Sequence, residues 1–75
     1  MKLKVAVAGA SGYVGGELLT LIAEHPFLEL VTVTANSNVG QTVGDVHPEI
    51  HPFKNLVFVE TSKSTLVGHD VVFLA

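Results

Sequence analysis

The 75-residue sequence has no cysteine, which excludes disulfides, thiolate metal sites and a cysteine nucleophile within these residues. Charge is also scarce: four Lys+Arg stand against seven Asp+Glu, and no basic cluster occurs. Nucleic acids and anionic membrane surfaces are therefore poor partners. The apolar runs are only a few residues long, whereas a membrane span needs about 20. A cysteine-free chain without a targeting segment predicts a cytoplasmic protein.

Apolar residues, in contrast, are abundant, at 48% of the chain. Disordered chains have low hydrophobicity, so this chain is expected to fold. A globule of this size has a large surface for its volume and needs polar residues to cover it. We therefore expect these residues to be the first part of a longer protein.

The order of short patterns predicts a βαβ unit. Leu3 to Ala8 is a valine-rich run that ends at a glycine, which is typical of a buried parallel strand. A helix is expected over Glu17 to Glu24, because Leu18, Leu21 and Ile22 fall on one helical face, which we expect to be buried. The helix should end before Pro26, since a proline pushes the preceding residue out of the α region. Leu28 to Ala35 is β-branched and predicts a second strand. Such crossovers are right-handed, so the two strands are expected to be parallel.

The second half of the chain adds two further strands. Residues 36–55 are expected to form a long loop with room for one helical turn. A third strand is expected over residues 56–59, a short helix capped by Thr61 or Ser62, and a fourth strand over residues 70–75. The predicted fold class is α/β, the first half of a Rossmann-type doubly wound parallel sheet with spatial strand order 3-2-1-4.

Three glycines at intervals of three lie between the first strand and the helix. Gly9 allows a sharp turn, Gly12 allows a pyrophosphate to approach the backbone, and Gly15 allows the helix to pack closely on the strand. The N–H groups of the first helical turn and the helix dipole favour an anion there, and Ser11 adds a hydroxyl donor. A plain glycine-rich turn is the alternative. In this strand–turn–helix context we favour dinucleotide binding.

The end of the second strand indicates which dinucleotide is bound. NAD-preferring sites place Asp or Glu about 20 residues after the glycines, where it accepts from the ribose 2′-OH. Here Asn36 and Ser37 stand at that place, and a 2′-phosphate would meet no carboxylate. We therefore favour NADP, although no arginine is near to pair with that phosphate. Alternatively, the two residues only build a turn.

The histidines suggest a metal site only at first sight. His47 and His51 are four residues apart, but each is followed by a proline, which disfavours a helical pair of ligands. We expect no metal, and we expect both histidines to lie in a solvated loop. Tyr13 is interpreted as a packing residue beside the glycine turn rather than as a proton donor.

Four stretches spread over nearly the whole chain carry a family resemblance. They are VAVAGASGYVGGELL at 5–19, His25-Pro26, TANSNVGQ at 34–41 with the following Val46-His47-Pro48, and GHDVVFLA at 68–75. In these residues the chain resembles the N-acetyl-gamma-glutamyl-phosphate reductases of arginine biosynthesis.

The resemblance implies an NADPH-dependent reductase that converts an acyl phosphate, N-acetyl-gamma-glutamyl phosphate, to an aldehyde. A cysteine thiolate and a histidine would act from beyond these residues, so no catalytic residue is assigned here. Residues 1–75 would be part of the NAD(P)-binding Rossmann domain, and the absent catalytic domain would build a homo-oligomer. The cofactor-binding residues carried over are Gly9, Ser11, Gly12, Tyr13, Val14 and Gly15 at the pyrophosphate and Asn36 and Ser37 at the ribose.

Two alternatives stay open. A similar glycine turn opens extended short-chain dehydrogenases such as nucleotide-sugar epimerases, which carry a Tyr-x-x-x-Lys motif further along the chain. A non-catalytic nucleotide-sensing Rossmann module would carry neither that motif nor the cysteine and histidine.

Overall fold

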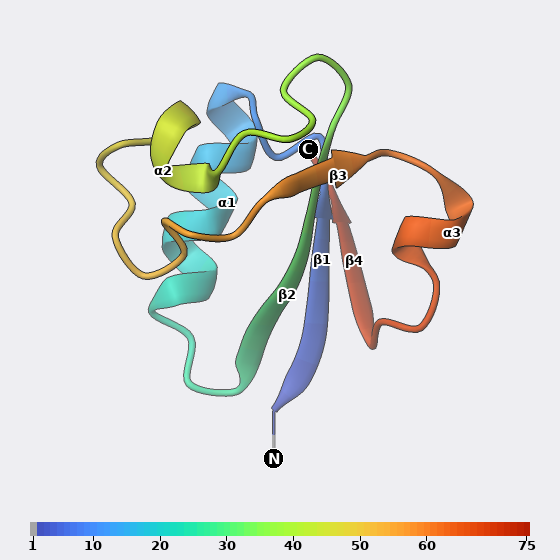
Figure 1. Cartoon of the computed structure of the whole chain (residues 1–75). Coiled ribbons are helices and arrows are strands. Elements are labelled where there is room, and N and C mark those ends of the chain that lie inside the picture. The colour runs from blue at the N-terminus through green and yellow to red at the C-terminus, as the bar shows by residue number, and fades with distance from the viewer. Residues whose placement is uncertain (1) are drawn as a thin grey trace.

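Within residues 2–75, four parallel strands and three helices alternate in the sequence (Figure 1). The computed structural model describes residues 2–75. In chain order the elements are β1 (Leu3–Ala8), α1 (Tyr13–Ala23), β2 (Leu28–Ala35), α2 (Val43–Val46), β3 (Phe58–Glu60), α3 (Lys63–Leu66) and β4 (Val71–Leu74). The strands are hydrogen-bonded in the order β3-β2-β1-β4, and all three pairings are parallel. The predicted fold class and strand order are confirmed.

The two faces of the sheet are covered unequally. Helices α1 and α2 lie on one face and α3 on the other (Figure 1). Side chains of successive residues alternate between the faces of a strand. The apolar core lies on the α1 side and is made by Val5, Val7, Leu19, Ile22, Leu30, Val33, Val43, Ile50 and Phe58. On β4, Leu74 is 80% exposed.

Helix α1 begins four residues earlier than expected and buries a different face. Its buried residues are Gly15, Gly16, Leu19 and Ile22, whereas Leu21 is exposed. The expectation that Leu21 faces the core is therefore wrong. The two glycines carry no side chain, so the helix presses this narrow side against the turn and strand, and Leu19 and Ile22 follow on the same side one and two turns later.

The remaining elements match expectation with small shifts. The loop after β2 contains one helical turn, α2, as predicted. Strand β3 begins at Phe58 rather than at residue 56, because Val57 forms an antiparallel bridge with Thr42 instead. Ser62 is the residue that caps α3, and its side chain accepts from the Thr65 amide. In residues 2–75 no helix has the length and apolarity needed to cross a membrane.

Candidate functional site: the glycine turn

The turn between β1 and α1 leaves the first helical amides free of side-chain caps. Gly9 ends the strand with φ +75°, a backbone conformation that glycine adopts without strain. Gly12 is the N-cap of α1 and supplies no side-chain hydrogen bond, and no acidic residue lies in the first turn. The leading amides of a helix lack partners within the helix and carry the positive end of its dipole. This end of α1 is therefore suited to an anion.

The turn has an inner side, formed by Gly9, Ala10 and Gly15, that is fixed to the protein. The Thr34 side chain accepts from the Gly9 amide at 3.3 Å, and the Thr34 carbonyl accepts from the Ala10 amide at 2.9 Å. Ala10 and Thr34 are both fully buried. The end of β1 is thus tied to the end of β2.

Gly12 and Gly15 meet different surroundings. A Cβ added to Gly15 would lie 2.6 Å from the Ala10 Cα, a distance that no packing tolerates. A Cβ added to Gly12 would meet nothing within 4 Å. Gly15 is therefore required by the contact between α1 and the turn, whereas Gly12 borders open space where a ligand has room.

The turn also has an outer side, formed by Ser11, Gly12, Tyr13 and Val14. Ser11 is half-buried and the other three are exposed. Tyr13 is 82% exposed, so the interpretation that it packs beside the turn is wrong. Because α1 begins at Tyr13, the ring projects from the first residue of the helix into solvent. All four residues are open to a ligand.

Asn36 and Ser37 follow β2 directly and are both exposed. In a parallel sheet the carboxyl ends of neighbouring strands meet at one edge, so they lie at the same edge of the sheet as the glycine turn. Beyond them, the Asn38 side chain donates to Gln41 Oε1 at 2.7 Å, which braces the loop. All eight sequence-predicted residues thus lie at the carboxyl edge of β1 and β2.

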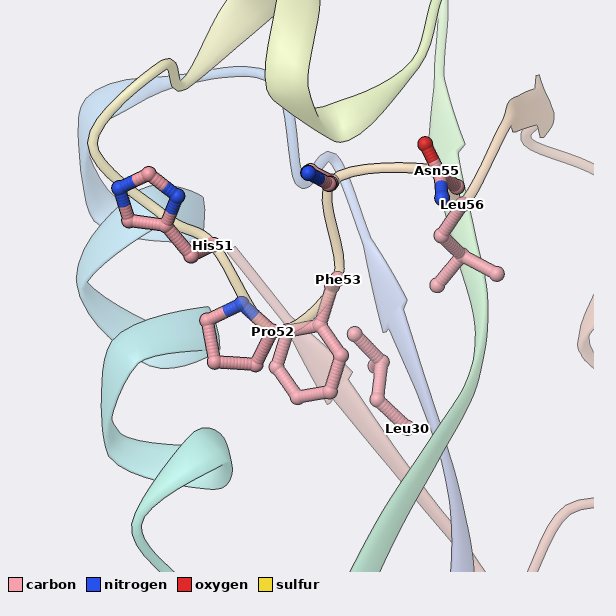
Figure 2. Close-up of a pocket in the computed structure, with 7 residues that line it drawn as sticks. Leu30, His51, Pro52, Phe53, Asn55 and Leu56 are labelled. Atoms are coloured by element: carbon pink, nitrogen blue, oxygen red, sulfur yellow. The ribbon is translucent and has the colours of Figure 1, made fainter.

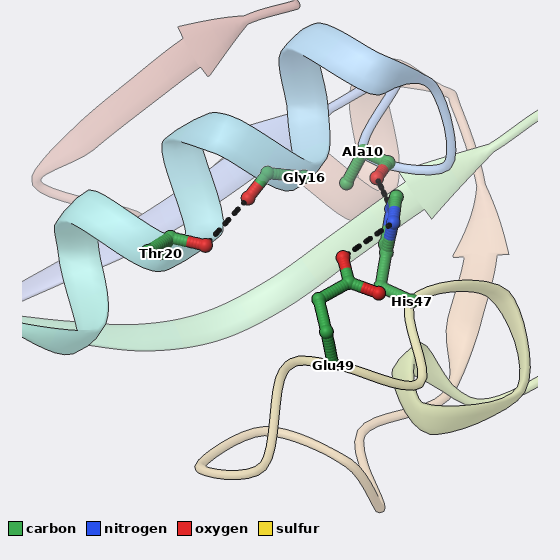
Figure 3. Close-up of polar contacts among 5 residues, drawn as sticks. All are labelled: Ala10, Gly16, Thr20, His47 and Glu49. Atoms are coloured by element: carbon green, nitrogen blue, oxygen red, sulfur yellow. Dashed lines mark hydrogen bonds and ion pairs between the residues drawn. The ribbon is translucent and has the colours of Figure 1, made fainter.

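His47 is a residue that the sequence analysis missed. It was expected in a solvated loop, but it is buried, and its Nε2 lies 2.8 Å from the Ala10 carbonyl oxygen (Figure 3). The ring lies against Gly16, where an added Cβ would be 2.9 Å from Cε1. A second glycine inside a helical pattern usually has a packing reason, and Gly16 was the available signal.

Two hollows in the described residues lie away from the turn. One, of about 390 Å³, is open and is lined by Leu30, Leu56 and the segment from His51 to Asn55 (Figure 2). The other lies between α1 and the loop near Glu49. Neither contains a predicted cofactor residue. This is consistent with a phosphate site made of backbone amides at a sheet edge, which needs no deep cavity. No group of three or more potential metal ligands occurs within residues 2–75.

Comparison with known proteins identifies the family. The profile described as "Semialdehyde dehydrogenase, NAD binding domain" matches residues 4–75. The chain belongs to this family. Membership of this family does not favour the epimerase alternative.

Individual relatives agree with the resemblance read from the sequence. The chain is 53% identical over all 75 residues to the N-acetyl-gamma-glutamyl-phosphate reductase of Streptomyces avermitilis. It is 56% identical over the same length to the enzyme of that name from Acidothermus cellulolyticus. A crystal structure of aspartate semialdehyde dehydrogenase with NADP from Candida albicans matches the whole chain with a TM-score of 0.86 at 28% identity, and the match covers 23% of that chain. The chain spans 22% of the length of both reductases.

Proposed function

We propose that these residues bind the cofactor in an NADPH-dependent reductase that converts N-acetyl-gamma-glutamyl phosphate to N-acetylglutamate semialdehyde. The observation that carries the proposal is the uncapped start of α1 beside the open side of Gly12. This helix start belongs to a chain that shares about half of its residues with N-acetyl-gamma-glutamyl-phosphate reductases. The alternative of a non-catalytic module has no specific observation in its favour.

The proposed reaction divides the work between this domain and the remainder of the protein. Bound NADPH would supply the hydride, so that the acyl phosphate, NADPH and one proton would give the aldehyde, NADP+ and inorganic phosphate. The residues described here bind and orient: the outer-side amides would face the pyrophosphate, and Ser11 would add a hydroxyl donor. Because these 75 residues contain no cysteine, a thiol nucleophile would come from another part of the protein.

The preference for NADP over NAD is proposed from the residues after β2. Asn36 and Ser37 are exposed and neutral, so a 2′-phosphate meets no repulsion from their side chains. The structural relative from Candida albicans, a protein with a similar fold here, was solved with NADP. We assign Asn36 and Ser37 to the adenine ribose and the six glycine-turn residues, Gly9 and Ser11 to Gly15, to the pyrophosphate.

The organisation of the whole protein is also proposed. Residues 1–75 would be one part of an NAD(P)-binding domain, and a separate catalytic domain would carry the nucleophile and join copies into a homo-oligomer. The acyl phosphate would be the small-molecule substrate, and the enzyme would work in the cytoplasm.

The test is an assay of the full-length protein that carries these residues. With N-acetyl-gamma-glutamyl phosphate, NADPH absorbance should fall, and one phosphate should be released per NADPH oxidised. Aspartyl phosphate serves as the control substrate and should be reduced far more slowly. Binding of NADPH without oxidation in the presence of the substrate would contradict the reductase and support a sensing module.

A further inference from the structure

His47 reaches the glycine turn from a different part of the chain. It is the C-cap of α2, and its own amide donates to the Val43 carbonyl at 2.7 Å. A capping box between Thr42 and Asp45 fixes the start of the same turn of helix. The buried Val43 anchors α2 in the core. The backbone that carries the imidazole is therefore held firmly before the ring meets the glycine turn.

The contact with Ala10 requires a hydrogen on one particular ring nitrogen. A carbonyl oxygen only accepts, so His47 Nε2 carries the hydrogen and donates it to the Ala10 oxygen. The other ring nitrogen, Nδ1, lies 4.0 Å from a Glu49 carboxylate oxygen (Figure 3). That carboxylate is mostly exposed, so water screens its attraction to the ring and the contact contributes little. The bond to Ala10 is therefore the significant polar contact of the ring.

The direction of this bond determines where the next amide points. The Ala10 carbonyl and the Ser11 N–H belong to one planar peptide unit, and no peptide bond in residues 2–75 is cis. In a trans unit the carbonyl and the N–H point in opposite directions. With the Ala10 oxygen directed inward to His47, the Ser11 N–H is directed toward the outer side, where Gly12 borders open space.

Gly16 makes this arrangement possible. An added Cβ there would lie 2.9 Å from His47 Cε1 and 3.0 Å from Nδ1, so any side chain would displace the ring. Two glycines in the first half of α1 thus have separate tasks: Gly15 lets the helix approach Ala10, and Gly16 lets the imidazole reach the same residue.

We propose that His47 is a positioning residue, which aims the Ser11 amide at the cofactor phosphates by holding the Ala10 carbonyl inward. The inference rests on the proposed binding of NADPH at this turn. It assigns to the segment 42–47 a role in shaping the pyrophosphate part of the site, which that segment does not itself line. Loss of the imidazole donor would release the Ala10–Ser11 peptide unit to rotate.

The experiment compares His47→Leu with His47→Gln in the full-length protein. Leucine has a similar size and no donor, whereas the glutamine amide nitrogen can replace Nε2. NADPH is titrated by its fluorescence, at a temperature where denaturant curves show each variant to be folded. We expect the Kd for NADPH to rise about 3- to 10-fold for His47→Leu, the range of one net hydrogen bond, and to stay within about twofold for His47→Gln. Glu49→Gln is the matched control and should bind as the wild type does.

A second measurement distinguishes positioning from a purely structural role. Hydrogen exchange of the segment 9–16 should become faster in His47→Leu than in His47→Gln. Where His47→Leu does not fold, Gly16→Ala takes its place, since the new methyl group displaces the ring. Unchanged NADPH affinity in a folded variant, with lowered stability alone, would overturn the inference. A wild-type protein that does not bind NADPH would overturn the proposed function, and this inference with it.

Discussion

The inner and outer sides of the glycine turn are adjacent in sequence but are built under opposite constraints. On the inner side, backbone and side chains fill the space: Gly15 touches Ala10, and Thr34 and His47 bind the polar groups of Gly9 and Ala10. On the outer side, Gly12 borders open space and Tyr13 and Val14 are exposed. The equally spaced glycines of the turn therefore have different roles. Except at His47, substitutions on the inner side should mainly change folding, and those on the outer side should change binding.

The largest effect is expected for Gly12→Val. Gly12 has φ −85° and ψ 179°, an extended conformation that valine readily adopts, so the fold should tolerate it. Its side chain would occupy the space assigned to the pyrophosphate, and NADPH binding should weaken by roughly 100-fold or more, about 2.7 kcal/mol. NADPH titration and denaturant unfolding of the full-length variant measure both properties. Binding with wild-type affinity would show that the turn does not hold phosphate.

Gly15→Val should have the opposite effect and lower the stability of the fold. Since even a Cβ would lie 2.6 Å from the Ala10 Cα, the helix must move away from the turn. We expect the free energy of unfolding to fall by roughly 1–3 kcal/mol, as for other overpacked sites. Gly12→Ala is the control and should leave stability nearly unchanged. If Gly15→Val is as stable as the wild type, the inner side is not the constraint described here.

Ser37→Asp tests the ribose end of the outer side. An aspartate would repel a 2′-phosphate and could accept from a free 2′-OH. The ratio of kcat/KM for NADPH to that for NADH should shift toward NADH by roughly 1–3 kcal/mol, the range of single-contact discriminations. Ser37→Asn, which adds no charge, is the control. A variant that keeps its full NADPH preference would remove Ser37 from the ribose site.

Thr34→Val gives the smallest expected change and probes the inner side without altering its volume. The Thr34 hydroxyl oxygen accepts from the Gly9 amide and from Thr61 Oγ1, the latter at 2.8 Å. Leaving the partly buried Gly9 amide unpaired should cost about 1–2 kcal/mol of unfolding free energy. Thr20 is exposed, and its hydroxyl donates only to the Gly16 carbonyl one turn earlier in the same helix, so Thr20→Val should change that free energy by less than about 0.5 kcal/mol. Equal effects of the two substitutions would show that the Thr34 bonds do not anchor the turn.

Local patterns were sufficient to predict the strands, their order and the position of the glycine turn. Valine-rich runs, the proline after α1 and the serine before α3 each act through neighbouring residues, so the sequence carries their information directly. The eight proposed cofactor residues are likewise placed by the rule that loops follow the carboxyl ends of parallel strands.

Three of the failed expectations depend on contacts between distant segments. His47 looked solvated because its partner, Ala10, is 37 positions away. Leu21 was assigned to the core because the buried face of α1 was chosen from its large apolar side chains. The face that packs on the sheet is instead the one where Gly15 and Gly16 have no side chain. Val57 was predicted to lie in the third strand, but it forms a bridge with Thr42, which no local pattern indicates.

The two edges of the sheet differ, and the difference has a consequence for handling the 75-residue chain in isolation. Within residues 2–75, β3 and β4 are the edge strands of the sheet. The outer backbone groups of Phe58 in β3 are already bonded to Gly40 and Gln41, whereas β4 is paired on one side only, with β1. Strand β3 is three residues long and ends in the charged Glu60, which discourages pairing with another chain. Strand β4 is Val-Val-Phe-Leu with no charge, and its last side chain is 80% exposed. Short uncharged segments of high β-propensity are aggregation sites, so copies of the isolated chain should associate through β4 first.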